Sequence, residues 1–167
     1  MRILGIDPGL NITGYGFVDA STHSLDIVDA GVIRPAGRTL EDRISSLFTD
    51  LNDLIKEIHP TVLAVEQIYS HYAHPRTAIQ MAHARGVILL SGRLGHLPIY
   101  HYSATQIKRQ LTGHGRAGKA QVQRAVMMLF KLDRAPKPAD VADALAIGYC
   151  CSQHLSTNGR RDQRMRA

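Results

Sequence analysis

The sequence predicts an α/β protein whose five-stranded mixed sheet is flanked by helices. Two observations favour this class. The first part of the chain holds three short strand-like runs separated by turn residues, which predicts a meander built from hairpins. The rest alternates helical stretches with two further short apolar runs, which predicts strands separated by helices. The 167 residues suit one domain with a sizeable core.

The three early strands are predicted over Arg2–Ile6, Thr13–Asp19 and Leu25–Arg34. The first is a run of apolar and β-branched residues, and it ends at a turn that begins with Asp7. We expect the second strand to run antiparallel to the first across the turn at residues 8–12. Asp7 is therefore expected where a central strand leaves the sheet.

A helix and a buried strand are predicted next. Thr39 and Asp42 have the spacing of a capping box, and apolar residues follow at helical spacing to about His59, with charges opposite. A proline ends this amphipathic helix. The run 61–65 is almost wholly apolar, as in a strand buried on both faces, and it is followed by Glu66. Two predicted strands thus finish in an acid.

Residues 67–75 are interpreted as a loop, and a helix from Arg76 to Leu94 follows that is apolar nearly all round. Such a helix is buried on two sides, and in a chain of this size the second cover is expected to be another subunit. Arg85 within this helix is either a dimer contact or a core ion, and the sequence does not decide between them. The fifth strand is predicted over Pro98–Tyr102.

The last third of the chain is predicted to be mostly helical. A capped helix is expected over 103–111, a flexible basic loop over 112–119 and another helix over 122–129. The final helix is expected from 139 to about 154. The arginine-rich tail, 156–167, is predicted to be disordered, which leaves the preceding residues as a single domain.

Composition and charge narrow the range of possible functions. Hydrophobic residues make up 44% of the chain, which excludes global disorder. Lys and Arg (20) exceed Asp and Glu (14), so the net charge of +6 indicates a polyanionic partner, nucleic acid first and an anionic membrane second. A basic surface kept only for solubility is the alternative.

The cellular location is predicted from the cysteines and from the apolar runs. Cys150 and Cys151 are adjacent and there are no others, which indicates free thiols in a reducing cytosol. No apolar run reaches membrane-spanning length, and the N-terminal segment reaches an acid too early for a signal peptide. We therefore expect a cytoplasmic protein whose folded domain spans residues 1–155.

Asp140 and Asp143 lie three residues apart, so they share one face of the final helix. Apolar residues surround them, and like charges that are packed against a protein core repel each other and lose hydration. Capping of the helix start explains Asp140 well and Asp143 poorly. If this helix packs against the strand ends, the pair joins Asp7 and Glu66 in a cluster of carboxylates.

Such an all-oxygen cluster favours a hard cation, and Mg²⁺ or Mn²⁺ fits best. Two such ions can activate a water and stabilise the leaving oxygen in phosphodiester hydrolysis. A basic surface that holds a nucleic-acid backbone would bring the phosphate to them.

Several stretches, in order along the chain, are similar to blocks of the bacterial Holliday-junction resolvases of the RuvC type. Any one block is a weak match, whereas the opening block with five later blocks in register is specific, and together they cover roughly Met1 to Gln153. The opening block is Gly5–Gly9 with Thr13–Gly16. The later blocks are Val65–Gln67, Ala84–Gly86, Gln106–Lys108, Gly113–Gly115 continuing to Lys119–Val122, and Ala142–Ile147.

The resemblance implies a ribonuclease-H-like fold, a homodimer and a Mg²⁺-dependent endonuclease, with two ions per site and Mn²⁺ as a substitute. The dimer would make paired symmetric nicks across a four-way DNA junction in recombination and repair, beside the branch-migration proteins RuvA and RuvB. Lys108 and Lys119 match lysines near the active centre, and Lys119 is the better candidate for the scissile phosphate. The implied metal ligands and catalytic acids are Asp7, Glu66, Asp140 and Asp143.

Further DNA contacts are expected outside the acid cluster. Tyr69 stands where a phenylalanine that stacks on junction bases is common in the family, and a tyrosine can also stack. His114 and Arg116 lie in the basic loop, where they are expected to contact DNA. His71 and His74, in a polar loop, are interpreted as surface groups rather than metal ligands.

Three other functions fit the sequence less well than a resolvase does. The glycine-rich opening, Gly5–Gly14, resembles the phosphate cradle of sugar-kinase and actin-like ATPases, but those need two such halves and a longer chain. A non-catalytic junction-binding protein is disfavoured because all four acids are present. A related pre-ribosomal-RNA nuclease branch shares the fold, and the block after Gly113 with the full acid set favours the resolvase.

Overall fold

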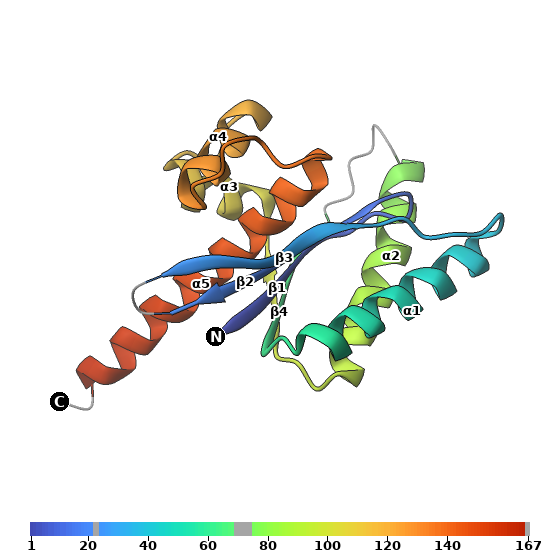
Figure 1. Ribbon diagram of the computed structural model, residues 1–167, viewed down its shortest axis with the longest axis horizontal. Coiled ribbons are helices and arrows are strands. Elements are labelled where there is room, and N and C mark those ends of the chain that lie inside the picture. The colour runs from blue at the N-terminus through green and yellow to red at the C-terminus, as the bar shows by residue number, and fades with distance from the viewer. Residues whose placement is uncertain (22–23, 69–74, 166–167) are drawn as a thin grey trace.

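A computed structural model gives the fold, and it describes residues 1–21, 24–68 and 75–165, with the backbone alone for 158–165. Its five strands form one mixed sheet in the order β3-β2-β1-β4-β5, which confirms the predicted fold class (Figure 1). No helix in these ranges is long and apolar enough to cross a membrane.

The sheet is built around a central strand, β1. The first three strands form the predicted antiparallel meander, and the other two run parallel to β1. Parallel neighbours bring their carboxyl ends to the same edge, and this edge carries the candidate site. The strands are β1 (Arg2–Asp7), β2 (Thr13–Ala20), β3 (Leu25–Ile33), β4 (Val62–Glu66) and β5 (Ile99–Tyr102).

Helices cover both faces of the sheet, so the molecule has three layers (Figure 1). The helices α1 (Leu40–Ile58) and α2 (Pro75–Leu94) cover one face and share an apolar core with it. The other face is covered by α5 (Ala139–Met165), and α3 (Ala104–Thr112) and α4 (Lys119–Leu129) pack against α5 and share its apolar core. Alternation along each strand therefore decides which layer a side chain meets.

Local signals in the sequence set the starts of two helices. In α1 the amide of Asp42 donates to Thr39 Oγ1 and the amide of Thr39 donates to Asp42 Oδ2, each at 3.2 Å, which is the predicted capping box. In α3 the same exchange joins Ser103 and Gln106, at 3.2 and 2.8 Å. These side chains satisfy amides that no helical carbonyl can reach.

The long helix α5 approaches the sheet so closely that glycine is required beneath it. A Cβ at Gly5 would lie 2.3 Å from the carbonyl oxygen of Ala144, and one at Gly14 would lie 2.2 Å from that of Asp140. Both neighbours are backbone atoms of α5, so a side chain could be accommodated only by moving the helix. The glycines of the opening stretch thus hold the first turns of α5 against β1 and β2, rather than forming a phosphate cradle.

The structure differs from the expected boundaries mainly at the C-terminus. The helix α5 continues to Met165, beyond the expected end near His154 and into the segment expected to be disordered. The hydroxyls of Ser156 and Thr157 donate, each at 2.8 Å, to carbonyl oxygens one turn earlier, and no proline interrupts this part of the chain. The arginines and the glutamine near the end of α5 are good helix formers, whereas residues 156–159 (Ser-Thr-Asn-Gly) are poor ones, so local propensity does not explain the continuation through this stretch.

Candidate active site

The candidate site lies where the carboxyl ends of β1 and β4 meet the first turn of α5. Ile6 pairs with Val65 in the parallel register, so the next residues of the two strands, Asp7 and Glu66, end side by side. Gly5 faces α5, and alternation therefore turns the Asp7 side chain toward the same helix. Both side chains are partly buried.

Asp140 and Asp143 lie on α5, which packs against this edge of the sheet. Gly14 is paired with Asp7 across the β1–β2 register, and the backbone of Asp140 lies against Gly14. Asp143 is one turn further along α5, on the same face and partly buried. The close packing of α5 on the glycines therefore places the helical pair of acids over the two strand-end acids, as predicted.

Electrostatics shows that the four acids act on one another. Burial raises the pKa of Asp7 to about 8, helped by the negative charges of Glu66, Asp143 and Asp140, and Lys119 opposes the shift. Burial also raises the pKa of Glu66, and the charge of Asp143 adds to this. For Asp143, burial raises the pKa while Lys119 opposes the rise and Asp140 adds to it. The folded protein thus holds mutually repelling carboxylates at this edge.

Two lysines face the acids from neighbouring helices. Lys119, the exposed first residue of α4, lowers the pKa values of Asp7 and Asp143, and Lys108 of α3 lowers those of Glu66 and Asp143. The site therefore has carboxylates on one side and ammonium groups on the other. This pairing suits a phosphodiester, whose oxygens can meet a cation held by the acids and a lysine at once.

The basic loop between α3 and α4 is held by hydrogen bonds, although the sequence led us to expect a flexible loop. Thr112 Oγ1 donates to the carbonyl of Lys108 at 2.8 Å and accepts from the amide of His114 at 3.3 Å. At the other end, the amide of Gly118 donates to Gln121 Oε1 at 2.9 Å. These bonds fix the positions from which both lysines approach the acids.

The donor set fits a hard divalent cation. The four carboxylates offer only oxygen ligands, and their mutual repulsion is what a divalent cation would relieve. Within the described ranges, no three potential ligands are already drawn together at metal-ligand spacing. A cation would therefore have to draw these side chains inward, and their role as ligands stays a prediction.

The other expected DNA contacts lie apart from the acids. His114 and Arg116 line a groove of about 540 Å³ beside α4, together with Arg124, which sequence reasoning missed. The one feature of the sequence that could have indicated Arg124 is that it is a basic residue on a helix that follows a basic loop. Tyr69, like His71 and His74, lies outside the described residues.

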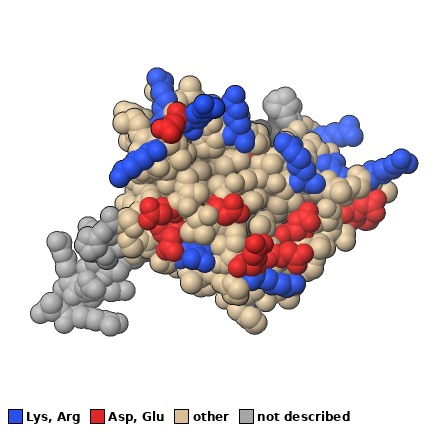
Figure 2. Space-filling view, viewed as in Figure 1, with Lys and Arg blue, Asp and Glu red and all other residues tan. Residues whose placement is uncertain are grey.

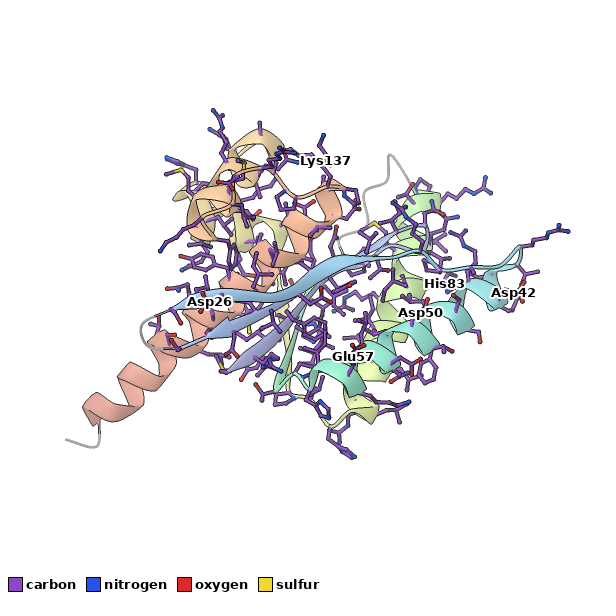
Figure 3. All side chains as sticks on the ribbon, in the orientation of Figure 1. Asp26, Asp42, Asp50, Glu57, His83 and Lys137 are labelled. Atoms are coloured by element: carbon purple, nitrogen blue, oxygen red, sulfur yellow. The ribbon has the colours of Figure 1, made fainter. Side chains whose placement is uncertain are left out.

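Charge is unevenly distributed over the surface. On the face shown in Figure 2, Lys and Arg gather over the layer of α3 and α4 and again at the end of the molecule where α1 and α2 lie, whereas most Asp and Glu lie between them, along β3 and α1. In Figure 3, Asp26 lies on β3 and Asp42, Asp50 and Glu57 lie along α1, while Lys137 lies near the start of α5. A polyanion is therefore attracted to the helical layer that carries the candidate site, and repelled from α1.

Comparison with known proteins gives consistent matches over most of the chain. Residues 3–151 match the family model for crossover junction endodeoxyribonuclease RuvC. The chain is 44% identical over 162 residues to the crossover junction endodeoxyribonuclease RuvC of Rhodopirellula baltica, covering 96% of this chain and 90% of that relative. The Thermus thermophilus RuvC structure superposes with a TM-score of 0.86 at 26% identity, covering 95% and 97% of the two chains. The same protein in complex with Holliday junction substrate gives 0.82 at 28% identity, covering 90% and 92%.

Proposed function

This chain belongs to the RuvC family of crossover junction endodeoxyribonucleases, and from that premise we propose that Asp7, Glu66, Asp140 and Asp143 form its catalytic centre. The chain has the family's ribonuclease-H-like fold, and it is a metal-dependent endonuclease that resolves Holliday junctions. The observation that carries the proposed centre is that the carboxyl ends of β1 and β4 lie against the start of α5, where the four acids are found. The raised pKa values of Asp7, Glu66 and Asp143 support it.

We propose Mg²⁺ as the natural cation, two per site, with Mn²⁺ as a substitute. Such cations supply Lewis-acid stabilisation to the attacking and leaving oxygens of a phosphodiester. The four carboxylates bind and orient them. Lys119 lies beside Asp7 and Asp143, so its ammonium group is placed to hold the scissile phosphate and to offset the charge that develops on it. Lys108 supports this from α3.

DNA outside the reacting phosphate is proposed to follow the basic groove beside α4. His114 and Arg116 line this groove and offer donors to backbone phosphates, which bind without reading sequence. Tyr69 follows the end of β4 by three residues, and its proposed role is to stack on a junction base.

We propose that the working unit is a homodimer joined through α2. Against the residues that the structure describes, this helix is buried on one side, whereas the sequence predicts cover on two sides. Ile79, Leu90 and Leu94 are 58%, 52% and 56% exposed and lie along one stripe of the helix. A Cβ at Gly86, in the same stripe, would meet no atom within 4 Å. Gly86 thus leaves room for the close approach of a second helix.

Two copies joined in this way carry two acid clusters, which suits paired nicks in two strands of one junction. By the same family relationship we propose that the protein works beside RuvA and RuvB in the cytoplasm. The buried free thiols of Cys150 and Cys151 are compatible with that reducing compartment.

The deciding experiment is nicking of a synthetic mobile four-way junction with Mg²⁺ or Mn²⁺, beside a linear duplex and an RNA–DNA hybrid. Symmetric paired nicks in the junction alone, lost in Asp7→Asn, support the proposed centre. Tight junction binding without cleavage in either metal would contradict catalysis. Cleavage of the hybrid instead of the junction would support the proposed catalytic centre but would identify an RNA–DNA hybrid as its substrate.

A further inference from the structure

Arg85 of α2 reaches across to the edge of the sheet that carries the acids. Its Nε donates to the backbone carbonyl oxygen of Glu66 at 3.2 Å, and its Nη2 donates to Nδ1 of His101 on β5 at 2.9 Å. One guanidinium group therefore joins α2 to the last residue of β4 and to β5. Within one chain, Arg85 is therefore held against the edge of the sheet by hydrogen bonds.

The carbonyl of Glu66 needs a donor because the strand ends there. The next amide, that of Gln67, donates to the carbonyl of Tyr102 at 2.8 Å, so it points toward β5. In a planar trans peptide the carbonyl points the opposite way, toward β1. The register of β1 with β4 ends at the pair Ile6–Val65, and Arg85 supplies the donor just beyond it.

Arg85 is poorly explained as a device for stability alone. It is partly buried, and among the described residues it forms no ion pair with an acid. Its donors go instead to one backbone carbonyl and one neutral ring nitrogen. Burial, with the charge of Arg85 in addition, lowers the pKa of His101, which keeps Nδ1 free to accept.

We propose that Arg85 is a positioning residue for Glu66, and that His101 holds the guanidinium group in place. The carbonyl contact fixes the backbone of Glu66, which sets where its carboxylate meets Asp143 and an incoming cation. The inference rests on the proposed function of the acids, and it adds two residues that do not touch the substrate.

The test uses the full chain and four variants. Arg85→Met removes both contacts and His101→Leu removes the support. His101→Asn keeps an acceptor where Nδ1 was. Lys56→Gln is the matched charge control, because Lys56 is exposed on α1 and pairs only with Asp53 in the structure. For each protein we would measure the affinity for the junction, the single-turnover nicking rate, and the Mn²⁺ concentration that gives half of the metal-induced rise in melting temperature.

Arg85→Met and His101→Leu are expected to lower the nicking rate and to raise the Mn²⁺ midpoint by roughly 10–100-fold, as loss of an outer-shell partner does. Junction affinity should stay within about twofold, since no DNA contact is removed. His101→Asn and Lys56→Gln should behave as wild type. The metal midpoint is the readout that a merely structural role would leave unchanged.

The proposal is overturned if Arg85→Met only lowers the metal-free melting temperature, with the Mn²⁺ midpoint and nicking rate unchanged. Should Arg85→Met fail to fold, the two His101 variants decide, because equal behaviour of Leu and Asn contradicts the support by His101. If the wild type does not nick junctions but its Mn²⁺ midpoint depends on Arg85, the proposed function fails and the positioning role stands.

Discussion

Asp143 is the single residue at which a catalytic and a structural role separate most clearly. Its charge raises the pKa values of Asp7 and Glu66, so the isosteric change Asp143→Asn removes a repulsion from the metal-free fold. We expect nicking to be abolished and the melting temperature in EDTA to rise by roughly 2–4 °C, the shift that about 1 kcal/mol gives in a domain of this size.

The measurement is a thermal scan in EDTA beside a nicking assay. Asp133→Asn is the control, because Asp133 is an exposed acid that precedes α5. A fall of several degrees in Asp143→Asn would show that the Asp143 carboxylate stabilises the fold, and the cluster of repelling acids would then be wrong at this position.

The pH dependence of stability follows from Asp7. Its pKa is raised from 3.8 to about 8, so folding favours the protonated form. The resulting destabilisation is absent below about pH 4, where both states are protonated; it grows as the pH rises from about 4 to about 8 and is constant above that. In EDTA the melting temperature should therefore fall from pH 5 to pH 8, and the slope should be smaller in Asp7→Asn. Equal slopes in the two proteins would contradict the assignment.

Substitution of Lys119 distinguishes a role in phosphodiester cleavage from a role in DNA binding. It is exposed at the start of α4 and acts on Asp7 and Asp143, so Lys119→Ala should leave junction affinity within about threefold. Single-turnover nicking should slow by roughly 100-fold, as when one donor to a developing charge is removed. Lys137→Ala, an exposed lysine before α5, controls for lost charge. If Lys119→Ala lost junction affinity and nicking rate to the same extent, Lys119 would only bind the DNA backbone and would have no role in the chemical step.

At the scale of elements, the sequence predicted what local patterns determine. The acid-ended strands, the capping boxes of α1 and α3, and the pair of acids on α5 all follow from short-range spacing. The contacts of Arg85 could not be predicted, because they join residues 16 and 19 positions away. The length of α5 could not be predicted either, because the charge and polarity of its C-terminal part indicate disorder and residues 156–159 (Ser-Thr-Asn-Gly) have low helix propensity.

The close packing of α5 against Gly5 and Gly14 can be tested by substitution. Gly14→Ala would place its Cβ 2.2 Å from the carbonyl oxygen of Asp140, so the first turn of α5 must shift. We expect a loss of about 1–3 kcal/mol in the free energy of unfolding, the usual consequence of overpacking, together with slower nicking. Chemical denaturation measures the first effect and single-turnover assays the second.

Gly118→Ala is the control for stability in that experiment. Gly118 has an ordinary φ of −76°, and its added Cβ would meet only Gln121 Oε1, at 3.9 Å. Its free energy of unfolding should stay close to that of wild type. If Gly14→Ala were equally harmless, α5 would not be held by the close contact that positions Asp140.

At the scale of the whole molecule, function depends on how many acid clusters meet one junction. Each chain has one such cluster, whereas resolution by symmetric nicks requires two strands to be cut. A twofold dimer through α2 would supply the second cluster, and its interface would include Leu90 of each copy, which lies in the exposed stripe of α2. Dimerisation and paired cutting are therefore expected to be lost together.

Leu90→Glu tests this link, because it adds two like charges to an apolar interface at positions that face water in a single chain. We expect an 18.4 kDa monomer in sedimentation equilibrium, whereas for the wild type we expect twice this mass. Leu40→Glu, at an exposed leucine in the first turn of α1, should remain dimeric.

A supercoiled plasmid with an extruded cruciform then reads the coupling of the two nicks. Two nicks within one encounter linearise the plasmid, whereas a single nick relaxes it and removes the cruciform, which leaves open circles. Wild type and Leu40→Glu should yield mostly linear product, and Leu90→Glu mostly open circles. A wild-type protein that linearises the plasmid while sedimenting as a monomer would disprove the dimer as the cutting unit. A Leu90→Glu protein that stays dimeric would place the interface elsewhere.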